Sequence, residues 1–181
     1  MLQLKVTLAP EGWDEQKEEF VDAIEQVLEL EHSLVSVSKW ESKYCKPFIS
    51  TKAKTYEETL DYIKFMTLTP NVDPHVYECM TKAHIDEINS YIEAPMTATT
   101  VRDNKKGGGG QEAVTSELIY YWMIALQIPS EYQYWHLNRL LMLVKVCNAK
   151  NQPPKKMSNQ DVISRNKALN EARKKQYNTK G

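Results

Sequence analysis

The fold of this chain is decided by the stretch TSELIYYWMIALQIPSEYQYWHLNRLLMLVKVCN, residues 115–148. Its first half is apolar at nearly every position as far as Ile128, which predicts a helix buried on most sides. Pro129 follows at once and leaves room only for a tight turn. A second helix is predicted to open at Ser130, because Ser followed three residues later by Gln133 matches a capping box. Leucines and valines then recur at helical spacing. We expect a helical hairpin around which the rest of the chain packs.

The N-terminal end of the chain predicts a small β element instead. Apolar and polar residues alternate with a period of two from Leu2 to Leu8, which predicts a strand with one buried face. The turn residues Ala9–Gly12 end that strand. A lone strand has no hydrogen-bonding partner, so we expect an extended return to it near Gln26–His32.

Several shorter helices are predicted between these two parts. Each begins at a residue whose side chain can cap a helix, and the first ends before Pro47, since proline disfavours a helical residue in front of it. The expected caps are Ser33, Thr55 and Asp73, the last with Pro74 at the first helical position. A further helix carries Ile85, Ile88, Tyr91 and Ile92 and ends at Pro95, after which the Thr-rich residues 96–101 predict a short edge strand.

The glycines of the chain are concentrated in one segment. Residues 103–111 include Gly107–Gly110, four of the six glycines, beside two lysines. Such a segment buries no side chains, so a mobile loop is predicted. A phosphate-binding loop would need a defined glycine spacing followed by Lys-Ser/Thr, or a preceding strand in a βαβ unit, and the sequence offers neither.

Charge divides the chain into an acidic body and a basic end. Residues 149–181 carry nine Lys/Arg and two Asp/Glu, a net charge of +7, whereas residues 1–148 carry fourteen and twenty-two, a net charge of −8. We therefore predict one mostly helical domain over 1–150, with N-terminal strands, and a basic, weakly folded C-terminal helix or tail over 151–181. The predicted fold class is mainly α with a small N-terminal β element, built around the central helical hairpin.

No residue pattern points to catalysis, a cofactor or a metal. The three cysteines are widely spaced and odd in number, which favours reduced and mostly buried thiols over a disulfide framework or a zinc cluster. His75, Cys79 and His84 lack the four-ligand spacing of structural zinc. His136 is predicted to be a packed or capping histidine. The sequence contains no apolar run of membrane-spanning length and no signal segment, so we expect the chain in the cytoplasm of the cell that makes it.

A DNA-binding helix-turn-helix is an alternative interpretation of the hairpin, because its turn is short. The second helix would read bases with Asn138, Arg139 and Lys145. The body around it is acidic, however, and phosphate repulsion opposes binding unless the basic tail dominates. Nucleic acid is accordingly not expected as a partner.

Aromatic residues form two groups that exceed what a core of this size needs. Exposed tyrosine and tryptophan side chains are typical of protein interfaces, because they offer apolar area together with a polar group. We therefore predict a partner-binding role for Trp40, Tyr44 and Phe48 around the first helix, and for Tyr120, Tyr132, Tyr134 and Trp135 around the hairpin turn.

Word-like strings along nearly the whole chain resemble a known family. They are LEHSLVSVSKWESK (30–43), KPF (46–48), ETLDYIK (58–64), APMTAT (94–99), SELIYYWM (116–123), WHLNRLL (135–141) and QPPKKM (152–157). The chain resembles the tail assembly chaperones of tailed bacteriophages, which are small products of the tail gene cluster. No residue role is carried over from that family.

The resemblance implies a non-enzymatic assembly factor in the host cytoplasm. Such chaperones coat the long helical tape measure protein, keep its apolar surface from aggregating, and are displaced as tail tube subunits polymerise. In many of these systems a ribosomal frameshift adds a second domain that recruits the tail tube protein. Self-association is a further expectation, and a minor structural protein of the virion is the alternative within phage biology.

Overall fold

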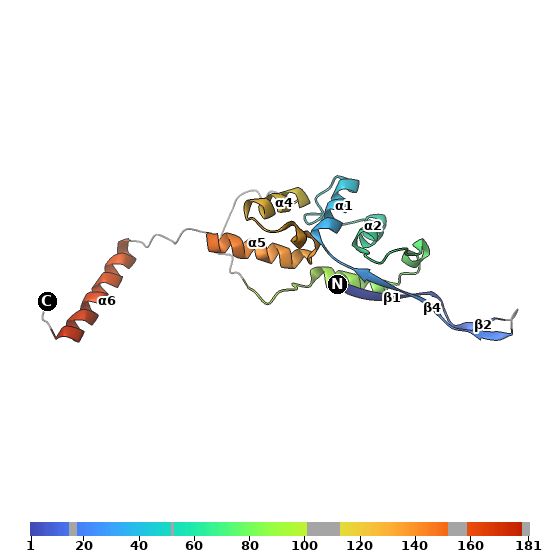
Figure 1. Ribbon diagram of the computed structural model, residues 1–181, viewed down its shortest axis with the longest axis horizontal. Coiled ribbons are helices and arrows are strands. Elements are labelled where there is room, and N and C mark those ends of the chain that lie inside the picture. The colour runs from blue at the N-terminus through green and yellow to red at the C-terminus, as the bar shows by residue number, and fades with distance from the viewer. Residues whose placement is uncertain (15–17, 52, 101–112, 152–158, 179–181) are drawn as a thin grey trace. The chain divides into compact units, whose positions relative to one another are not determined.

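The computed structural model describes residues 1–14, 18–51, 53–100, 113–151 and 159–178 (Figure 1). As predicted, these residues are mainly helical, with small antiparallel β-hairpins at the N-terminal end. The chain divides into two compact units, Met1–Ala149 and Lys150–Gly181, and each is described by itself. The elements are β1 (Leu2–Ala9), β2 (Gly12–Asp14), β3 (Glu19–Val21), β4 (Ile24–Leu30), α1 (Leu34–Tyr44), α2 (Tyr56–Met66), η1 (Pro74–Tyr77), α3 (Lys82–Glu93), α4 (Ser116–Ala125), η2 (Ser130–Tyr134), α5 (Leu137–Asn151) and α6 (Asn159–Tyr177).

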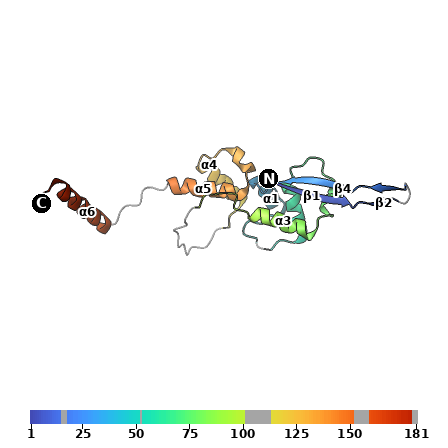
Figure 2. The ribbon, with the colours of Figure 1, turned by 90° about the horizontal axis from the view of Figure 1, so that it is seen from below.

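The predicted return strand is confirmed: β4 pairs antiparallel with β1, with Leu2 opposite Leu30 and Leu4 opposite Leu28. The period-two alternation buries one face of this ribbon, and β1 packs against α3 and η1 (Figure 2). The chain does not reverse direction directly after β1. It continues into β2, which pairs antiparallel with β3 before the chain returns as β4. In that pair Trp13 lies opposite Phe20, and the two side chains are 62% and 60% exposed.

One edge of the ribbon is covered by the chain that follows α2. The Glu31 N–H donates to the Met66 carbonyl (2.9 Å), and the Leu68 N–H donates to the Glu29 carbonyl (2.8 Å). The Glu29 N–H donates in turn to the hydroxyl of Thr69 (2.8 Å). These three bonds satisfy backbone groups at the outer edge of β4 in its C-terminal half.

Helix α1 is a central packing element of the first unit, together with residues of the predicted hairpin. Ser33 caps α1 in a reciprocal capping box with Ser36, as the sequence indicated, and the helix ends before Pro47. Its buried face contacts α2, α4 and η2, with Trp40 fully buried.

The other predicted caps are also present. Thr55 caps α2, Asp73 caps the short 3-10 helix η1 with Pro74 at its start, and α3 ends before Pro95. The cap of α3 is Thr81, in a reciprocal box with His84. The edge strand predicted over 96–101 is absent from its described residues, 96–100, which are irregular; Val101 and the glycine-rich loop at 103–111 lie outside the described residues.

The second hairpin helix begins seven residues later than predicted. Residues Ser130–Tyr134 form the 3-10 helix η2 without a side-chain cap, and Trp135 is extended, so that α5 starts at Leu137. Tertiary contacts override the local capping signal here. The Leu137 N–H donates to the His32 carbonyl (2.7 Å), and the backbone of His136 bridges to Ser33 beside it.

The first hairpin helix is less buried than predicted. Within α4 the buried residues are Ser116, Ile119 and Met123, whereas Tyr121 is 63% and Ile124 is 77% exposed. One face of α4 packs against α1. The other face is also apolar, and Tyr121 and Ile124 on it are left exposed by the described part of the chain. An apolar helix surface of this kind is available to a partner.

The second unit contains α6, whose described side chains are all exposed. Neither α6 nor any other described helix is long and apolar enough to cross a bilayer. The prediction of mostly buried thiols is wrong, because Cys45 is exposed and Cys79 and Cys147 are half-buried; none of the three forms a disulfide.

Candidate functional site

Three adjoining hollows form a groove across the helices of the first unit. The first, of about 460 Å³, lies between α2 and α3; the second, about 400 Å³, lies between α3 and α5; the third, about 270 Å³, lies between α4 and α5. The first two share Phe48, Lys54, Ile92 and Glu93, and the last two share Ile49 and Leu141. We call this surface the apolar groove.

The walls of the apolar groove come from helix faces with apolar residues at helical spacing. On α3 these are Ile85, Ile88 and Ile92, which recur at i, i+3 and i+7. On α5 they are Leu141 and Val144, three residues apart, and α4 adds Trp122. These apolar helix faces therefore form part of the core and also line the hollows between the helices.

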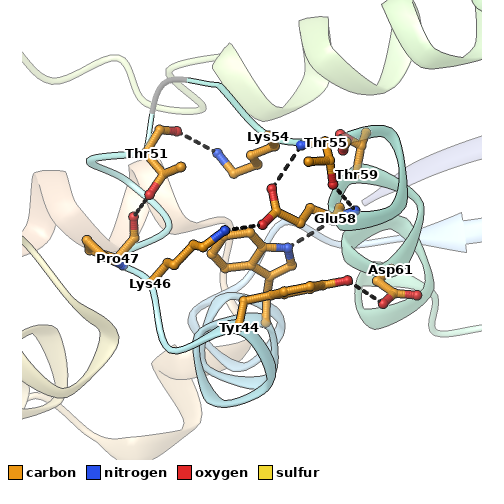
Figure 3. Close-up of polar contacts among 10 residues, drawn as sticks. Tyr44, Lys46, Pro47, Thr51, Lys54, Thr55, Glu58, Thr59 and Asp61 are labelled. Atoms are coloured by element: carbon orange, nitrogen blue, oxygen red, sulfur yellow. Dashed lines mark hydrogen bonds and ion pairs between the residues drawn. The ribbon is translucent and has the colours of Figure 1, made fainter.

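Phe48 lies on the floor of the groove and joins it to the aromatic interior. Its ring centroid is 4.1 Å from that of Tyr62 and 5.1 Å from that of Trp40. The ammonium of Lys54 lies 4.0 Å from the Phe48 ring centroid and donates to the Phe48 carbonyl (3.1 Å). It also donates to the Thr51 carbonyl (3.0 Å), as Figure 3 shows. Burial lowers the pKa of Lys54, since little water solvates its charge.

The polar groups beneath this floor are satisfied by one another. Glu58, in the first turn of α2, accepts from Lys46 (2.6 Å) and from the Thr55 N–H (2.8 Å), and the Lys46 bond holds its carboxyl pKa low (Figure 3). Asp61 likewise accepts from Lys43 and from the Tyr44 hydroxyl (2.7 Å), which lowers its pKa. These ion pairs fix the α1–α2 packing rather than present charge to a ligand.

A buried carboxylate of α1 holds the backbone at Phe48 and at the start of α4. Glu41, which is buried, accepts the backbone N–H of Phe48 (2.7 Å) through one oxygen and that of Ser116 (2.7 Å) through the other. Ser116 is the first residue of α4, where helix N–H groups lack partners inside the helix. Glu41 therefore acts as a cap for α4 from a distant part of the sequence.

Two histidines are packed at the start of α5. The His32 ring bonds through Nδ1 with the Tyr62 hydroxyl (2.5 Å), and its centroid is 5.0 Å from that of His136. Burial lowers the pKa of His32 to about 3 and also lowers that of His136, so both are neutral near pH 7. His136 also accepts the Asn138 N–H (3.3 Å), which confirms its predicted packing and capping role. This pair joins the segment after β4 to the start of α5, and the Nε2–H of neutral His136 donates to the Tyr91 carbonyl (3.0 Å).

The predicted partner-binding residues form the two expected clusters, but only some of them reach the surface. Trp40 and Phe48 are buried, and Tyr44 is half-buried with its hydroxyl on Asp61, so this first group is core except where Phe48 meets the groove. Placing Trp40 on a binding surface was therefore wrong. Its indole N–H donates to the Glu58 carbonyl (2.9 Å) inside the unit.

The second predicted group gathers around η2 and is more open. Tyr132 stacks on Trp135 with ring centroids 4.1 Å apart, and the Arg139 guanidinium lies 4.0 Å from the Trp135 centroid. Tyr120 is half-buried and donates its hydroxyl to Gln133 (3.0 Å), whereas Tyr134 is 62% exposed. This aromatic cluster is preorganised by its own contacts.

The residues needed for a DNA-reading helix are engaged within the unit. The Asn138 amide donates to the carbonyls of Ile92 and Ala94 (2.9 Å each), and Arg139 lies over Trp135. A reading helix needs such side chains directed toward base edges. The structure thus gives the helix-turn-helix interpretation no support.

No group of three or more His, Cys, Asp or Glu side chains that could hold a metal ion occurs in the described part of the chain. The chain matches no family model, no curated protein and no solved structure. Phe48 is the residue of the groove that was predicted from the sequence to bind a partner, and the other lining residues were missed. The signal for them was the isoleucine spacing of 85–92, which predicts a buried face equally well whether the covering partner is the same chain or another one.

Proposed function

We propose that this chain is a non-enzymatic tail assembly chaperone of a tailed bacteriophage that holds helical segments of the tape measure protein in its apolar groove. The observation that carries the proposal is the continuity of the three hollows, which share lining residues at both joins. The residues that the groove takes from α3, Ile85 to Glu93, cover about 12 Å, and those from α5, Leu137 to Asn148, about 17 Å, at about 1.5 Å per residue. That length suits a few turns of a helix.

A helical occupant fits the groove better than an extended one. The groove is walled by helices, so a peptide in extended form would find no strand edge for its own backbone N–H and C=O groups. A helix satisfies those groups internally and presents apolar side chains at i, i+3, i+4 and i+7. The tape measure protein, expected to be long and helical from the family resemblance, offers such stripes.

The charge of the body supports the same role. A tape measure protein without its surrounding tube exposes apolar stripes, which associate and precipitate. A bound coat with a net charge of −8 over residues 1–148 would keep the complexes apart by repulsion. The aromatic cluster around η2 and the exposed face of α4 supply further contact area. Recruitment of the tail tube protein through a longer frameshifted form, self-association, and action in the host cytoplasm belong to this proposal.

Co-expression with the tape measure protein of the same gene cluster tests the proposal. The tape measure protein is expected in the pellet when expressed alone and in the supernatant, bound to this chain, when both are present. Binding is mainly apolar, so the complex should survive moderate salt, whereas a nucleic-acid complex would lose affinity steeply. A tape measure protein that stays insoluble with no complex at either salt concentration would refute the assignment.

Three variants separate the candidate surfaces. Ile49→Glu places a charge where the second and third hollows join and should abolish the complex. Leu68→Glu is the matched control, because Leu68 is also exposed and apolar but lines none of the hollows described. Tyr134→Ala tests the aromatic cluster, and loss of the complex with this variant alone would move the binding surface to η2. Finding the chain in purified virions would instead favour a structural protein.

A further inference from the structure

Two opposite charges border the join between the first and second hollows. Lys54 and Glu93 each line both hollows, Lys54 from the segment before α2 and Glu93 from the last residue of α3. The other residues shared at this join, Phe48 and Ile92, are apolar. A ligand that crosses from one hollow to the next therefore passes a cation and an anion next to these two apolar side chains.

The ammonium of Lys54 is held in place but not neutralised. It is half-buried and donates to two backbone carbonyls, which use two of its three N–H groups. Glu58, the nearby carboxylate, is occupied by Lys46 and Thr55. No ion pair joins Lys54 to any carboxylate of the described residues.

Glu93 is the complementary group. It is exposed, and its carboxylate forms neither a hydrogen bond nor an ion pair with another residue of the described chain. Lys54 and Glu93 thus face the same passage without pairing with each other. A purely apolar helix bound over this join would remove water from the Lys54 ammonium without offering it a carboxylate or another acceptor. Such a helix would therefore bind less tightly.

We propose that the apolar groove selects amphipathic helices whose apolar stripe is interrupted by a carboxylate that pairs with Lys54, with a basic residue beside it that meets Glu93. This selection rests on the proposed function, because it takes a helix as the groove's occupant. The pair of charges fixes the register of the helix and, since the two groups differ in sign, its direction along the groove. Segments of the partner that carry an uninterrupted apolar stripe are bound less tightly.

Designed helical peptides test the selection without the tape measure protein. Three peptides of about five turns share one apolar stripe and differ at its central position, which is Glu, Gln or Lys. Binding to the full chain is measured by fluorescence anisotropy. The Glu peptide should bind roughly tenfold more tightly than the Gln peptide, the scale expected of a partly buried ion pair, and the Lys peptide most weakly.

Variants of the chain assign the effect to Lys54. Lys54→Met should remove the preference for Glu over Gln, and Lys54→Glu should reverse it in favour of the Lys peptide. Lys39→Glu is the matched control, since Lys39 is exposed on α1 away from the groove, and should leave the order unchanged. Thermal melts check that each variant folds. If Lys54→Glu does not fold, the result with Lys54→Met alone decides whether Lys54 causes the preference for Glu.

The outcomes are distinguishable. Equal affinity for the Glu and Gln peptides, or the same change with Lys39→Glu, would overturn the selection while leaving helix binding in the groove intact. Binding of none of the three peptides would overturn the selection and remove the groove as a helix site. The co-expression experiment then decides separately whether the tape measure protein is held elsewhere on the chain.

Discussion

Replacing Glu41 should destabilise the first unit by more than any surface change, because one carboxylate serves two distant backbone groups. Glu41→Ala leaves the N–H groups of Phe48 and Ser116 without their acceptors in a site where Ser116 is fully buried. Glu41→Gln keeps one acceptor oxygen and turns an amide donor toward the other N–H. The alanine variant should therefore be affected about twice as strongly as the glutamine variant.

The magnitude follows from the number of orphaned groups. A buried donor that loses its partner costs about 1–3 kcal/mol, so two cost about 2–6 kcal/mol and one about half of that. Relief from burying a charge offsets part of the cost and favours the middle of the range, about 4 kcal/mol for alanine. For a unit of this size each kcal/mol lowers Tm by about 2–4 °C, so we expect a fall of about 12 °C for alanine and about 6 °C for glutamine.

Thermal unfolding followed by circular dichroism measures the two shifts. Glu87→Ala is the control, because Glu87 is exposed on α3 and its removal should change stability by less than about 0.5 kcal/mol. Hydrogen exchange adds a local readout, since the Phe48 and Ser116 amides should lose protection before the ribbon does. Equal melting of Glu41→Ala and Glu87→Ala, with both amides still protected, would refute the reasoning.

Three further predictions concern pH, the C-terminal unit and metal. The pKa of His32 is about 3 in the folded chain against about 6.5 when unfolded, so the unfolded state gains a proton first, and His32 alone should lower stability by about 1.4 kcal/mol per unit as pH drops below about 6.5. The pKa of His136 is also lowered by burial, so His136 adds to this slope. Urea midpoints from pH 7 to 4.5 should show the slope, and His32→Asn should reduce it to the contribution of His136. The pKa of Asp61 is lowered in the folded chain, so the stability that its ionised carboxylate contributes is lost only at more acid pH. A chain ending at Lys150 should melt within a few degrees of the full chain, because the described side chains of α6 are exposed; failure to fold cooperatively would contradict this. Chelator treatment should leave the helical circular dichroism unchanged, and one stoichiometric zinc lost together with the fold would show that the prediction is wrong.

Local signals in the sequence were sufficient for most element boundaries. Ser33, Thr55 and Asp73 cap the helices predicted for them, because a capping hydrogen bond involves residues only two or three positions apart. The return of β4 to β1 followed from the need of a strand for a partner. The caps depend on neighbours along the chain, whereas the strand pairing joins distant residues and was predicted because a lone strand needs a partner.

The errors lie where tertiary contacts decide. Ser130 has the sequence of a capping box but makes no side-chain cap, since the His32 carbonyl and the Ser33 backbone position the start of α5 instead. The exposure of Ile124 could not be predicted either, because the apolar composition of a helix does not determine how many of its faces are covered by other elements. The candidate site shares this difficulty. Ile85, Ile88 and Ile92 were expected as a buried helix face, and only the spacing of α2, α3 and α5 shows that part of that face borders an open groove.

The covered edge of the ribbon has a consequence for the proposed function, in which the chain binds a client that aggregates. Unpaired strand edges recruit other strands, and a chaperone with two such edges would itself seed the cross-β association that it should prevent. Residues 66–69 occupy the C-terminal half of the β4 edge with three hydrogen bonds. On the β1–β4 ribbon the outer edge of β1 has no strand partner among the described residues, and this strand carries Lys5 on its exposed face. Charge on that strand disfavours a second copy in register, because like charges would then be brought close together.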